Sequence, residues 1–434
     1  MDYKAIISLI IFILTYFFIA IEKTPKIYVS FVSVLLLILL KVYNFDEVPS
    51  YIDWNTISFL FGIFLIVKVL EISGFFNYLS LKILKKFNYD VIKIFIFFPL
   101  LSWFLSCFIG SITVLTFLAP LTYTLCRILK IDPVSIIIAE VCLSNVGGAG
   151  TLMGDPPNVI LSSMFNLGFT HFLLNNFLIS FIASISSIFT FYIMNKGYLL
   201  KIKENFDKSS LESIIPEEAI EDRVLSKYGI YGLICVVFLL VFRDFIKEYF
   251  PLNFGVCSFL PAIFILLSKG SSEKIKNIIK EIDIETLLFF ICLFVIVGSL
   301  EKTEVIKKFA FLMKNFAKSG FKMNFILFWF SVITSAFIDN VPEAMSIGYL
   351  IKHISKFIPY KFTILVWSAS LGLDMGGNFT PIGASANVVA YGFLESHGIK
   401  IGWKKWIKLM FLPNFFAVSV SYILLHLKFI IGFY

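Results

Sequence analysis

The sequence predicts an all-α polytopic membrane protein, and three observations carry this prediction: the composition, the spacing of apolar blocks and an internal duplication. Of the 434 residues, 59% are hydrophobic and 15% are charged, whereas a soluble domain is about half apolar and about a quarter charged. The composition excludes a water-soluble globule. The chain also lacks the alternating segments of roughly ten residues that are typical of outer-membrane barrels, so the expected spans are helices.

The apolar residues form blocks that are separated by short polar stretches. A helix needs about 20 apolar residues to cross the hydrocarbon core of a bilayer, so the blocks leave room for about ten spanning helices. The blocks run over residues 4–21, 27–42, 55–72, 94–126, 134–165, 171–194, 230–245, 253–268, 284–300, 324–351, 362–392 and 406–427.

A long polar segment divides the blocks into two sets of six. We expect a first repeat at 1–195, a connector at 196–229 and a second repeat at 230–434. Lysine and arginine are more frequent on the side of the predicted membrane that holds the connector, and such residues concentrate on the cytoplasmic side. The connector is therefore expected to be cytoplasmic, in a protein of the plasma membrane.

The two halves resemble one another in sequence. Residues 53–71 match residues 283–301 at eight of 19 positions, with an offset of 230. Residues 145–160 match residues 374–389 at six of 16 positions, with an offset of 229. Repeats of this kind are typical of transporters, whose two copies meet around a site near the middle of the membrane.

Each half contains a glycine-rich break within an apolar block. Glycine and proline do not sustain a continuous helix, so broken helices are expected at 134–165 and 362–392. A break leaves carbonyl oxygens and N–H groups that can bind ions. The backbone candidates are Gly147, Gly148, Gly154, Gly376, Gly377 and Gly383, and the side-chain candidates are Asn145, Thr151, Asp155, Asn158, Asp374, Asn378, Thr380, Ser385 and Asn387.

Two further blocks carry polar residues at their centres and are predicted to be re-entrant hairpins, at 94–127 and 324–351. The tip of the first holds Gly110 and Ser111, and that of the second holds the candidates Asp339, Asn340 and Glu343. Such irregular backbone persists at membrane depth where protein or a water-filled cavity covers it. With two hairpins, each half crosses the membrane five times, and the odd number predicts inverted repeats.

Four of these candidates are acids at membrane depth: Asp155, Asp339, Glu343 and Asp374. An ionised carboxylate there is costly unless it meets water, a partner or a bound ion. Lys68 is the one basic residue placed clearly inside a span, so the acids are expected to lack basic partners and to bind a proton or Na⁺. The net charge of +8 is assigned to topology rather than to a nucleic-acid partner, and neither a cofactor nor a dedicated metal centre is expected.

These features predict a secondary active transporter that works by alternating access and is not an enzyme. It would move a small inorganic ion or a small anion across the lipid bilayer, coupled to H⁺ or Na⁺. An ion channel and an intramembrane enzyme are the remote alternatives, but neither explains the duplicated breaks. No GxxxxGK[ST] motif is present, and the sequence does not indicate a partner ATPase, although an efflux pump could use one.

The motifs GTLMGDPPNVI, SAFIDNVPEA and LDMGGNFTPIGASANVVA resemble those of the ion transporter superfamily, in the branch of ArsB-type arsenical pump membrane proteins, NhaD-type antiporters and the P protein. The resemblance covers about residues 50–390. It implies the citrate-transporter-like fold, often as a homodimer with an elevator motion. It also implies transport-site roles for Asp155, Asn158, Asp339, Asn340, Asn378 and Asn387.

The resemblance favours two activities, arsenite-type efflux and Na⁺/H⁺ antiport. Sodium-coupled symport of a dicarboxylate or citrate is the alternative, although four acids would repel such an anion unless cations accompanied it. One departure concerns the first hairpin, where the family usually has an Asp-Asn or Ser-Asn-Thr element and this chain has Gly110-Ser111-Ile112. The departure puts one cation site, and with it sodium coupling, in question.

Overall fold

The computed structural model describes residues 2–21, 24–88, 90–129, 131–204, 215–246, 252–267, 278 and 280–432. All regular structure in these residues is helical, which confirms the predicted fold class of an all-α polytopic membrane protein. Six of the described helices are long and apolar enough to cross a membrane, and four more are apolar but shorter. The shorter ones are Tyr3–Ile19, Lys26–Leu39, Phe254–Leu267 and Val134–Gly148, of which the last is the first half of a broken helix.

The first half of the chain forms helices that follow the predicted blocks closely. They are α1 (Tyr3–Ile21), α2 (Lys26–Leu39), η1 (Phe45–Tyr51), α3 (Trp54–Ile72), α4 (Phe75–Lys86), α5 (Val91–Ile109), α6 (Ser111–Leu129), α7 (Val134–Gly148), α8 (Pro156–Phe165), α9 (Phe169–Phe172), η2 (Leu173–Phe177) and α10 (Leu178–Glu204).

The second half repeats this order. Its helices are η3 (Pro216–Ala219), α11 (Arg223–Ile246), α12 (Phe254–Leu267), α14 (Ile284–Lys302), α15 (Val305–Leu312), α16 (Lys314–Ala317), α17 (Gly320–Ser335), α18 (Asn340–Ile354), α19 (Thr363–Gly376), η4 (Gly377–Phe379), α20 (Ser385–Ser396) and α21 (Gly402–Ile430). Helices α10 and α11 extend into the predicted connector from both ends, and residues 205–214 of the connector lie outside the described part of the chain.

The duplicated stretch at 53–71 and 283–301 forms the equivalent helices α3 and α14, which begin with the same cap. The Asp53 carboxylate accepts hydrogen bonds from the backbone N–H of Thr56 at 3.2 Å and from its hydroxyl at 2.8 Å. The Asp283 carboxylate accepts the same two bonds from Thr286, at 2.9 and 2.5 Å. An aspartate at this position satisfies N–H groups that have no partner within the helix, so the sequence match reflects a shared helix start.

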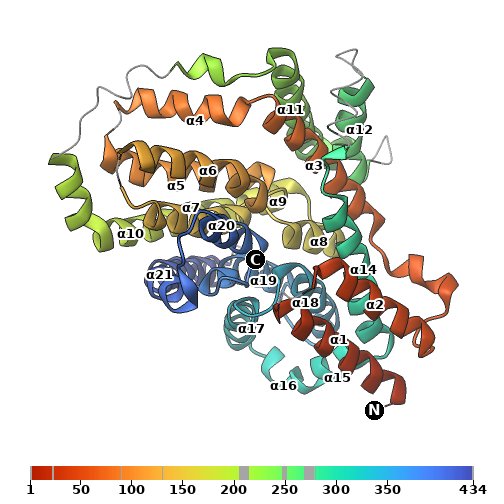
Figure 1. Ribbon diagram of the computed structural model, residues 1–434. Coiled ribbons are helices and arrows are strands. Elements are labelled where there is room, and N and C mark those ends of the chain that lie inside the picture. The colour runs from red at the N-terminus through yellow and green to blue at the C-terminus, as the bar shows by residue number, and fades with distance from the viewer. Residues whose placement is uncertain are drawn as a thin grey trace.

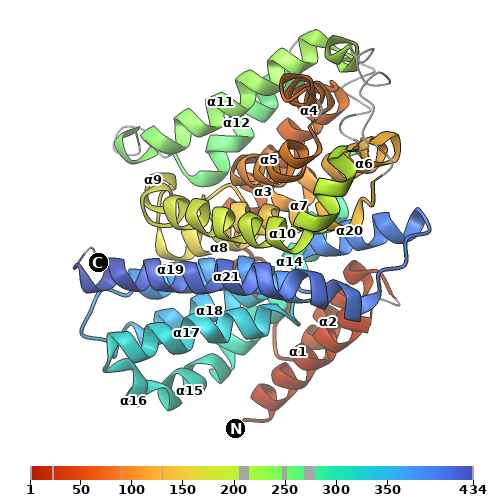
Figure 2. The same cartoon turned by 90° about the vertical axis from the view of Figure 1, so that its left-hand side faces the viewer.

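The two predicted hairpins and two predicted broken helices form a central unit. In Figure 1, α5, α7 and α10 lie on one side of this unit, and α17, α19 and α21 lie on the other. Helix α5 packs on α7 as α17 packs on α19, and α10 contacts α21, with which it runs side by side in Figure 2. Within this unit the two halves meet along α10 and α21, and the broken helices also contact one another through α7 and α19.

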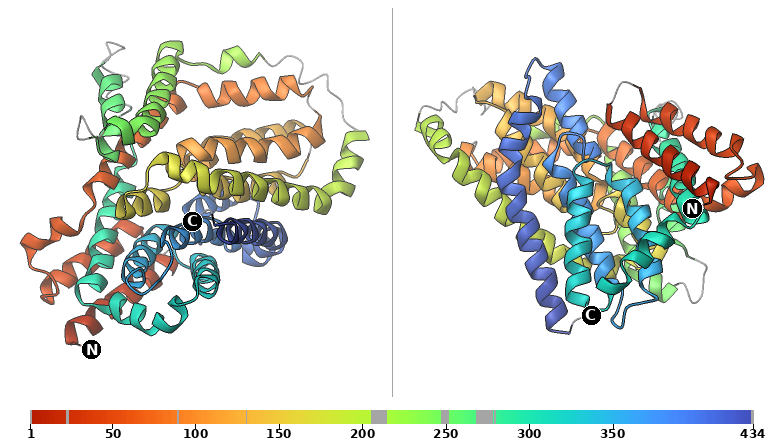
Figure 3. Two further views of the ribbon diagram at one scale, coloured as in Figure 1. Left: turned by 180° about the vertical axis from the view of Figure 1, so that it is seen from behind. Right: turned by 90° about the horizontal axis from the view of Figure 1, so that it is seen from below.

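A second group of helices borders the central unit. It contains α1, α2, α3, α11, α12 and α14, which contact one another in sequence-distant pairs such as α2 with α14 and α3 with α12. Seen from below in Figure 3, α1 and α2 lie on the side of the molecule opposite α10 and α21. Helix α14 also contacts α18 of the second hairpin, so the peripheral group reaches the hairpin directly.

Candidate functional site

The two breaks have the same hydrogen-bond pattern, displaced by 229 residues. The Asn158 side-chain amide donates to the carbonyl oxygens of Gly148 and Thr151, each at 2.9 Å. The Asn387 amide donates to the carbonyls of Gly377 and Thr380, each at 2.8 Å. Each asparagine lies in the first turn of the second half-helix and bonds backward to the end of the first half-helix, so it holds the two halves of the break together.

The breaks also pack tightly against themselves and against the hairpins. A Cβ atom on Gly154 would lie 2.4 Å from the carbonyl oxygen of Gly148, and one on Gly383 would lie 2.4 Å from that of Gly377. The Thr151 hydroxyl donates to the carbonyl of Cys107, and the Thr380 hydroxyl donates to that of Ala336, the equivalent residue. The predicted glycines and threonines therefore shape the breaks, through close backbone packing and through hydrogen bonds to backbone carbonyls.

Side chains from the following helices satisfy the carbonyls that the breaks expose. In the first half, Asn176 donates to Ala149 at 3.2 Å and Ser180 donates to Val146 at 2.6 Å. The equivalent carbonyls of Asn378 and Met375 accept hydrogen bonds from Trp406 at 3.2 Å and from Asn414 at 2.9 Å. These four donors were not predicted from sequence, because they lie in apolar segments distant from the motifs. These four carbonyls therefore have hydrogen-bond donors within the protein itself.

Asp155 is the centre of the site. Its carboxylate accepts a hydrogen bond from the Ser111 hydroxyl at 2.7 Å and another from the Asn340 amide at 2.7 Å. The same amide lies 3.4 Å from Oδ1 of Asp374, and Oδ2 of Asp374 is buried with no hydrogen-bond partner among the described residues. Asp155 is 4% exposed and Asp374 is fully buried. Both hairpin tips and both breaks thus converge on one pair of carboxyl groups.

A cluster of asparagines lies beside this pair. The Asn145 amide donates to the side-chain oxygens of Asn378 and Asn387, both at 2.8 Å. The Asn378 amide in turn donates to the Asn414 oxygen at 3.0 Å. The first three of these residues were predicted as site residues from sequence, and the structure brings them together across the two halves.

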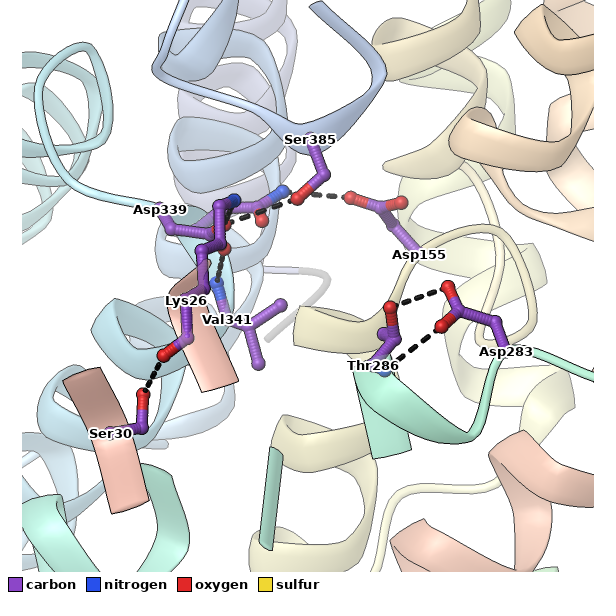
Figure 4. Close-up of polar contacts among 9 residues, drawn as sticks. Lys26, Ser30, Asp155, Asp283, Thr286, Asp339, Val341 and Ser385 are labelled. Carbon is purple, nitrogen blue, oxygen red and sulfur yellow. Dashed lines mark hydrogen bonds and ion pairs between the residues drawn. The ribbon is translucent and has the colours of Figure 1, made fainter. Parts of the chain in front are cut away.

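Asp339 has a different environment at the tip of the second hairpin, shown in Figure 4. Its Oδ2 atom accepts hydrogen bonds from the Lys26 ammonium at 3.0 Å and from the Ser385 hydroxyl at 3.1 Å. Its Oδ1 atom caps α18 by accepting the N–H of Val341 at 3.2 Å. The expectation that the acids lack basic partners is wrong for Asp339, because Lys26, at the first position of α2, reaches the hairpin tip across 313 residues of sequence.

Glu343 and Glu140 are buried acids with other surroundings. Glu343 accepts a hydrogen bond from Thr334 of its own hairpin rather than from another predicted site residue, and it borders an apolar cavity of about 520 Å³. Glu140, which the sequence analysis missed, is fully buried in α7 and accepts a bond from Thr122 at 2.5 Å. Glu140 could have been identified from sequence, since it is an acidic residue within an apolar block.

The site is acidic. Among the described residues, no lysine or arginine forms an ion pair with Asp155 or Asp374, and the ion pairs of Lys68 are with Glu71 and Glu281 at the end of the α3 span. The central carboxyl pair therefore relies on neutral donors alone. A fold of hairpins and broken helices around buried polar groups defines a polytopic membrane transporter.

The chain belongs to the citrate transporter family, whose model matches residues 16–372. The 46 kDa membrane protein of Mycobacterium leprae is 29% identical over 440 residues, covering 98% of this chain and 99% of the relative. An uncharacterized transporter of Mycobacterium tuberculosis is 30% identical over 419 residues, covering 93% of this chain and 94% of the relative. The family and these relatives identify a transporter and not an enzyme.

Two further similarities are more distant. The human P protein is 26% identical over 441 residues, which cover 85% of this chain and 52% of the P protein. The solved structure of Neisseria gonorrhoeae MtrF, described as illuminating a class of antimetabolite efflux pumps, shares the fold with a TM-score of 0.57 at 14% identity. This alignment covers 90% of the present chain and 83% of MtrF. The P protein match confirms the family branch that the motifs suggested.

Proposed function

We propose that the protein is a secondary active transporter that moves a small ion or oxyanion by alternating access, and that H⁺ or Na⁺ binds at Asp155 and Asp374 to drive it. The observation that carries this proposal is the Asn340 amide, which donates to Asp155 at 2.7 Å and lies 3.4 Å from Asp374. One neutral donor from the second hairpin thus joins a carboxyl group of the first break to a carboxyl group of the second.

The charge of this pair supports a cation as the coupling species. Two ionised carboxylates that lie side by side away from water repel one another, and a bound proton or metal cation offsets the repulsion. Their neighbours, Ser111, Asn340 and Asn158, supply only neutral groups. Because each half contributes one carboxyl group, a movement of one half relative to the other changes the geometry of the pair. Cation binding is thereby linked to the side of the membrane to which the transporter is open.

Na⁺/H⁺ antiport and arsenite-type efflux are the two activities that we favour. Both suit a site whose charged groups are acids, because neither requires a multivalent anion to bind beside them. The match of MtrF, an efflux pump by its description, is compatible with export but shows the fold alone. The family model itself supports a second candidate, the symport of citrate or a dicarboxylate together with cations.

We propose a homodimer in the plasma membrane with the 196–229 connector on the cytoplasmic side, and transport without a cofactor. Labelling single cysteines in the connector with a membrane-impermeant reagent in intact and opened cells tests the orientation. A connector that reacts fully in intact cells contradicts it.

Reconstituted protein in sealed liposomes tests the function. We expect an imposed Na⁺ or arsenite gradient to produce a pH change inside the vesicles, and an Asp374→Asn variant reconstituted in equal amount to produce none. Uptake of citrate that requires a metal cation identifies the second candidate instead. Fluxes that are far above carrier turnover and do not depend on the proton gradient contradict coupled transport.

A further inference from the structure

We propose that the Lys26 ammonium is a tethered counter-cation that fills the cation position at Asp339, and that its removal turns Asp339 into a binding site for a free monovalent cation. This deepens the proposed function, because it assigns coupling to Asp155 and Asp374 alone in the state shown. Its test is a binding measurement, so that its failure and the failure of transport coupling are distinguishable.

The two halves make the same serine–carboxylate contact with the partners exchanged between hairpin tip and break. In the first half, a serine at the hairpin tip, Ser111, donates to a carboxylate at the break, Asp155, at 2.7 Å. In the second half, the hairpin tip supplies the carboxylate, Asp339, and the break supplies the serine, Ser385, at 3.1 Å. Each half therefore has one carboxylate between its hairpin tip and its break, held by one serine hydroxyl.

The two carboxylates differ in the remaining donor. Asp155 receives the neutral amide of Asn340, whereas Asp339 receives the ammonium of Lys26 at 3.0 Å. Both carboxylates are more than nine-tenths buried, and a buried carboxylate requires a compensating charge or strong donors. At Asp339 the chain supplies that charge itself.

The space around the Lys26–Asp339 pair also fits a small cation. A cavity of about 20 Å³ adjoins Asp339 and Lys26, with Tyr16, Ile19 and Ile382 among its lining, and this volume holds about one water-sized species. The Tyr16 hydroxyl is buried there and has no hydrogen-bond partner among the described residues. A cation that replaced the ammonium would find a carboxylate oxygen and a phenolic oxygen beside the same cavity.

The position of Lys26 in its own helix indicates that Asp339 holds it there. Lys26 is the first residue of α2, where the positive end of the helix dipole disfavours a cationic side chain. Asp339, in contrast, is the N-cap of α18, where a negative charge is favoured. Because the Lys26 side chain is 31% exposed while that of Asp339 is 4% exposed, the flexible lysine is the partner that can leave.

Cation-dependent thermal stability of the full-length protein in detergent is the direct test. LiCl and NaCl are titrated against choline chloride at constant ionic strength. A ligand that binds only the folded state raises Tm in proportion to the logarithm of its concentration once the site saturates. We expect Lys26→Gln to show a rise of about 2 °C beyond that of the wild type, and Lys26→Gln/Asp339→Asn to lack this gain.

Three further variants sharpen the test. Lys26→Arg keeps the tethered charge and should show no additional rise in Tm. Lys41→Gln removes an exposed lysine just beyond the other end of α2 and should respond to cations as the wild type does. Lys26→Met removes the charge but keeps a long side chain, and it replaces Lys26→Gln if the latter does not fold. The proposal is overturned if neither Lys26→Gln nor Lys26→Met shows the additional cation-dependent rise in Tm. It is also overturned if that rise persists in Lys26→Gln/Asp339→Asn.

A second measurement needs no change at Lys26. Amine acylation followed by mass spectrometry should modify Lys26 several-fold faster in Asp339→Asn than in the wild type, with Lys41 unchanged as the internal reference. Equal rates at Lys26 contradict the ion pair. A wild type whose Tm does not respond to Na⁺ or Li⁺ would contradict Na⁺ coupling at Asp155 and favour H⁺ coupling, yet an additional rise in Lys26→Gln would still support the tethered cation.

Discussion

The Asn340 side-chain amide donates a hydrogen bond of 2.7 Å to Oδ2 of Asp155, which lies 185 residues earlier in the chain. The bond joins the second hairpin to the first broken helix, and the same amide lies 3.4 Å from Asp374 in the second broken helix. Three of the four interrupted segments therefore meet at one side chain. The fourth, the first hairpin, joins them through Ser111.

Replacing either central carboxyl should stop transport without unfolding the protein. Asp155→Asn and Asp374→Asn keep the size of the side chain but remove the group that binds the coupling cation, so we expect flux to fall to the level of empty liposomes. Thermal stability should remain within a few degrees of the wild type. Asp46→Asn, an exposed substitution outside the site, is the control. Full flux in either central variant would refute the assigned coupling site.

Replacing the two bridging asparagines by aspartate should destabilise both breaks equally. In Asn158→Asp and Asn387→Asp, the amide that donates to two carbonyls becomes an acceptor. Each buried carbonyl that loses its donor costs about 1–3 kcal/mol. We expect the free energy of unfolding to fall by at least about 2 kcal/mol in each variant, measured by denaturant titration in detergent. The exposed Asn88→Asp should change it little, and a loss in one half alone would argue against equivalent breaks.

Adding a methyl group inside the breaks should be costly, because the space is filled by backbone. Gly154→Ala and Gly383→Ala place a Cβ atom 2.4 Å from a carbonyl oxygen, and overpacking of this kind costs about 1–3 kcal/mol. Gly197→Ala and Gly392→Ala are matched controls, since a Cβ atom at either helical position meets nothing within 4 Å. Alanine there should leave Tm unchanged or raise it. Break variants as stable as these controls would contradict the tight packing.

The two threonines of the breaks should act through their hydroxyls. Thr151→Val and Thr380→Val remove the donor to a carbonyl at the end of the neighbouring hairpin helix, which leaves a buried acceptor unpaired at a cost of about 1–3 kcal/mol. Thr→Ser at the same positions keeps the hydroxyl and should recover most of the lost stability. Thermal unfolding of the four variants in parallel measures the difference. If valine and serine give equal Tm values, the hydroxyl bonds contribute nothing.

Much of the site followed from sequence because its chemistry is local. The glycines, prolines and asparagines of 145–160 and 374–389 interrupt their helices for reasons that act within a few residues, and the repetition at an offset of 229 marked both segments. The structure finds the same bonds in both, made by Asn158 and Asn387. The inverted relation of the two halves stays a prediction.

Three residues were not predicted because their roles are not local: Lys26, Asn176 and Trp406. Each acts on a partner more than 25 residues away in sequence, at 3.0 to 3.2 Å, and each lies in or beside an apolar block with no motif around it. Their roles depend on which helix ends and faces meet, and hydropathy does not specify this. Glu140 was missed although its signal was local.

The amino-acid order alone determined that this chain is a helical membrane protein with two interrupted copies of one unit, because hydrophobic length and helix-breaking residues act over short stretches. Only the tertiary structure decided which acid meets a lysine and which meets an amide. That choice depends on where the first residue of α2 lies relative to the second hairpin and on how the hairpins pack against the breaks, because the Lys26 ammonium lies 3.0 Å from Asp339 and the Asn340 amide lies 2.7 Å from Asp155.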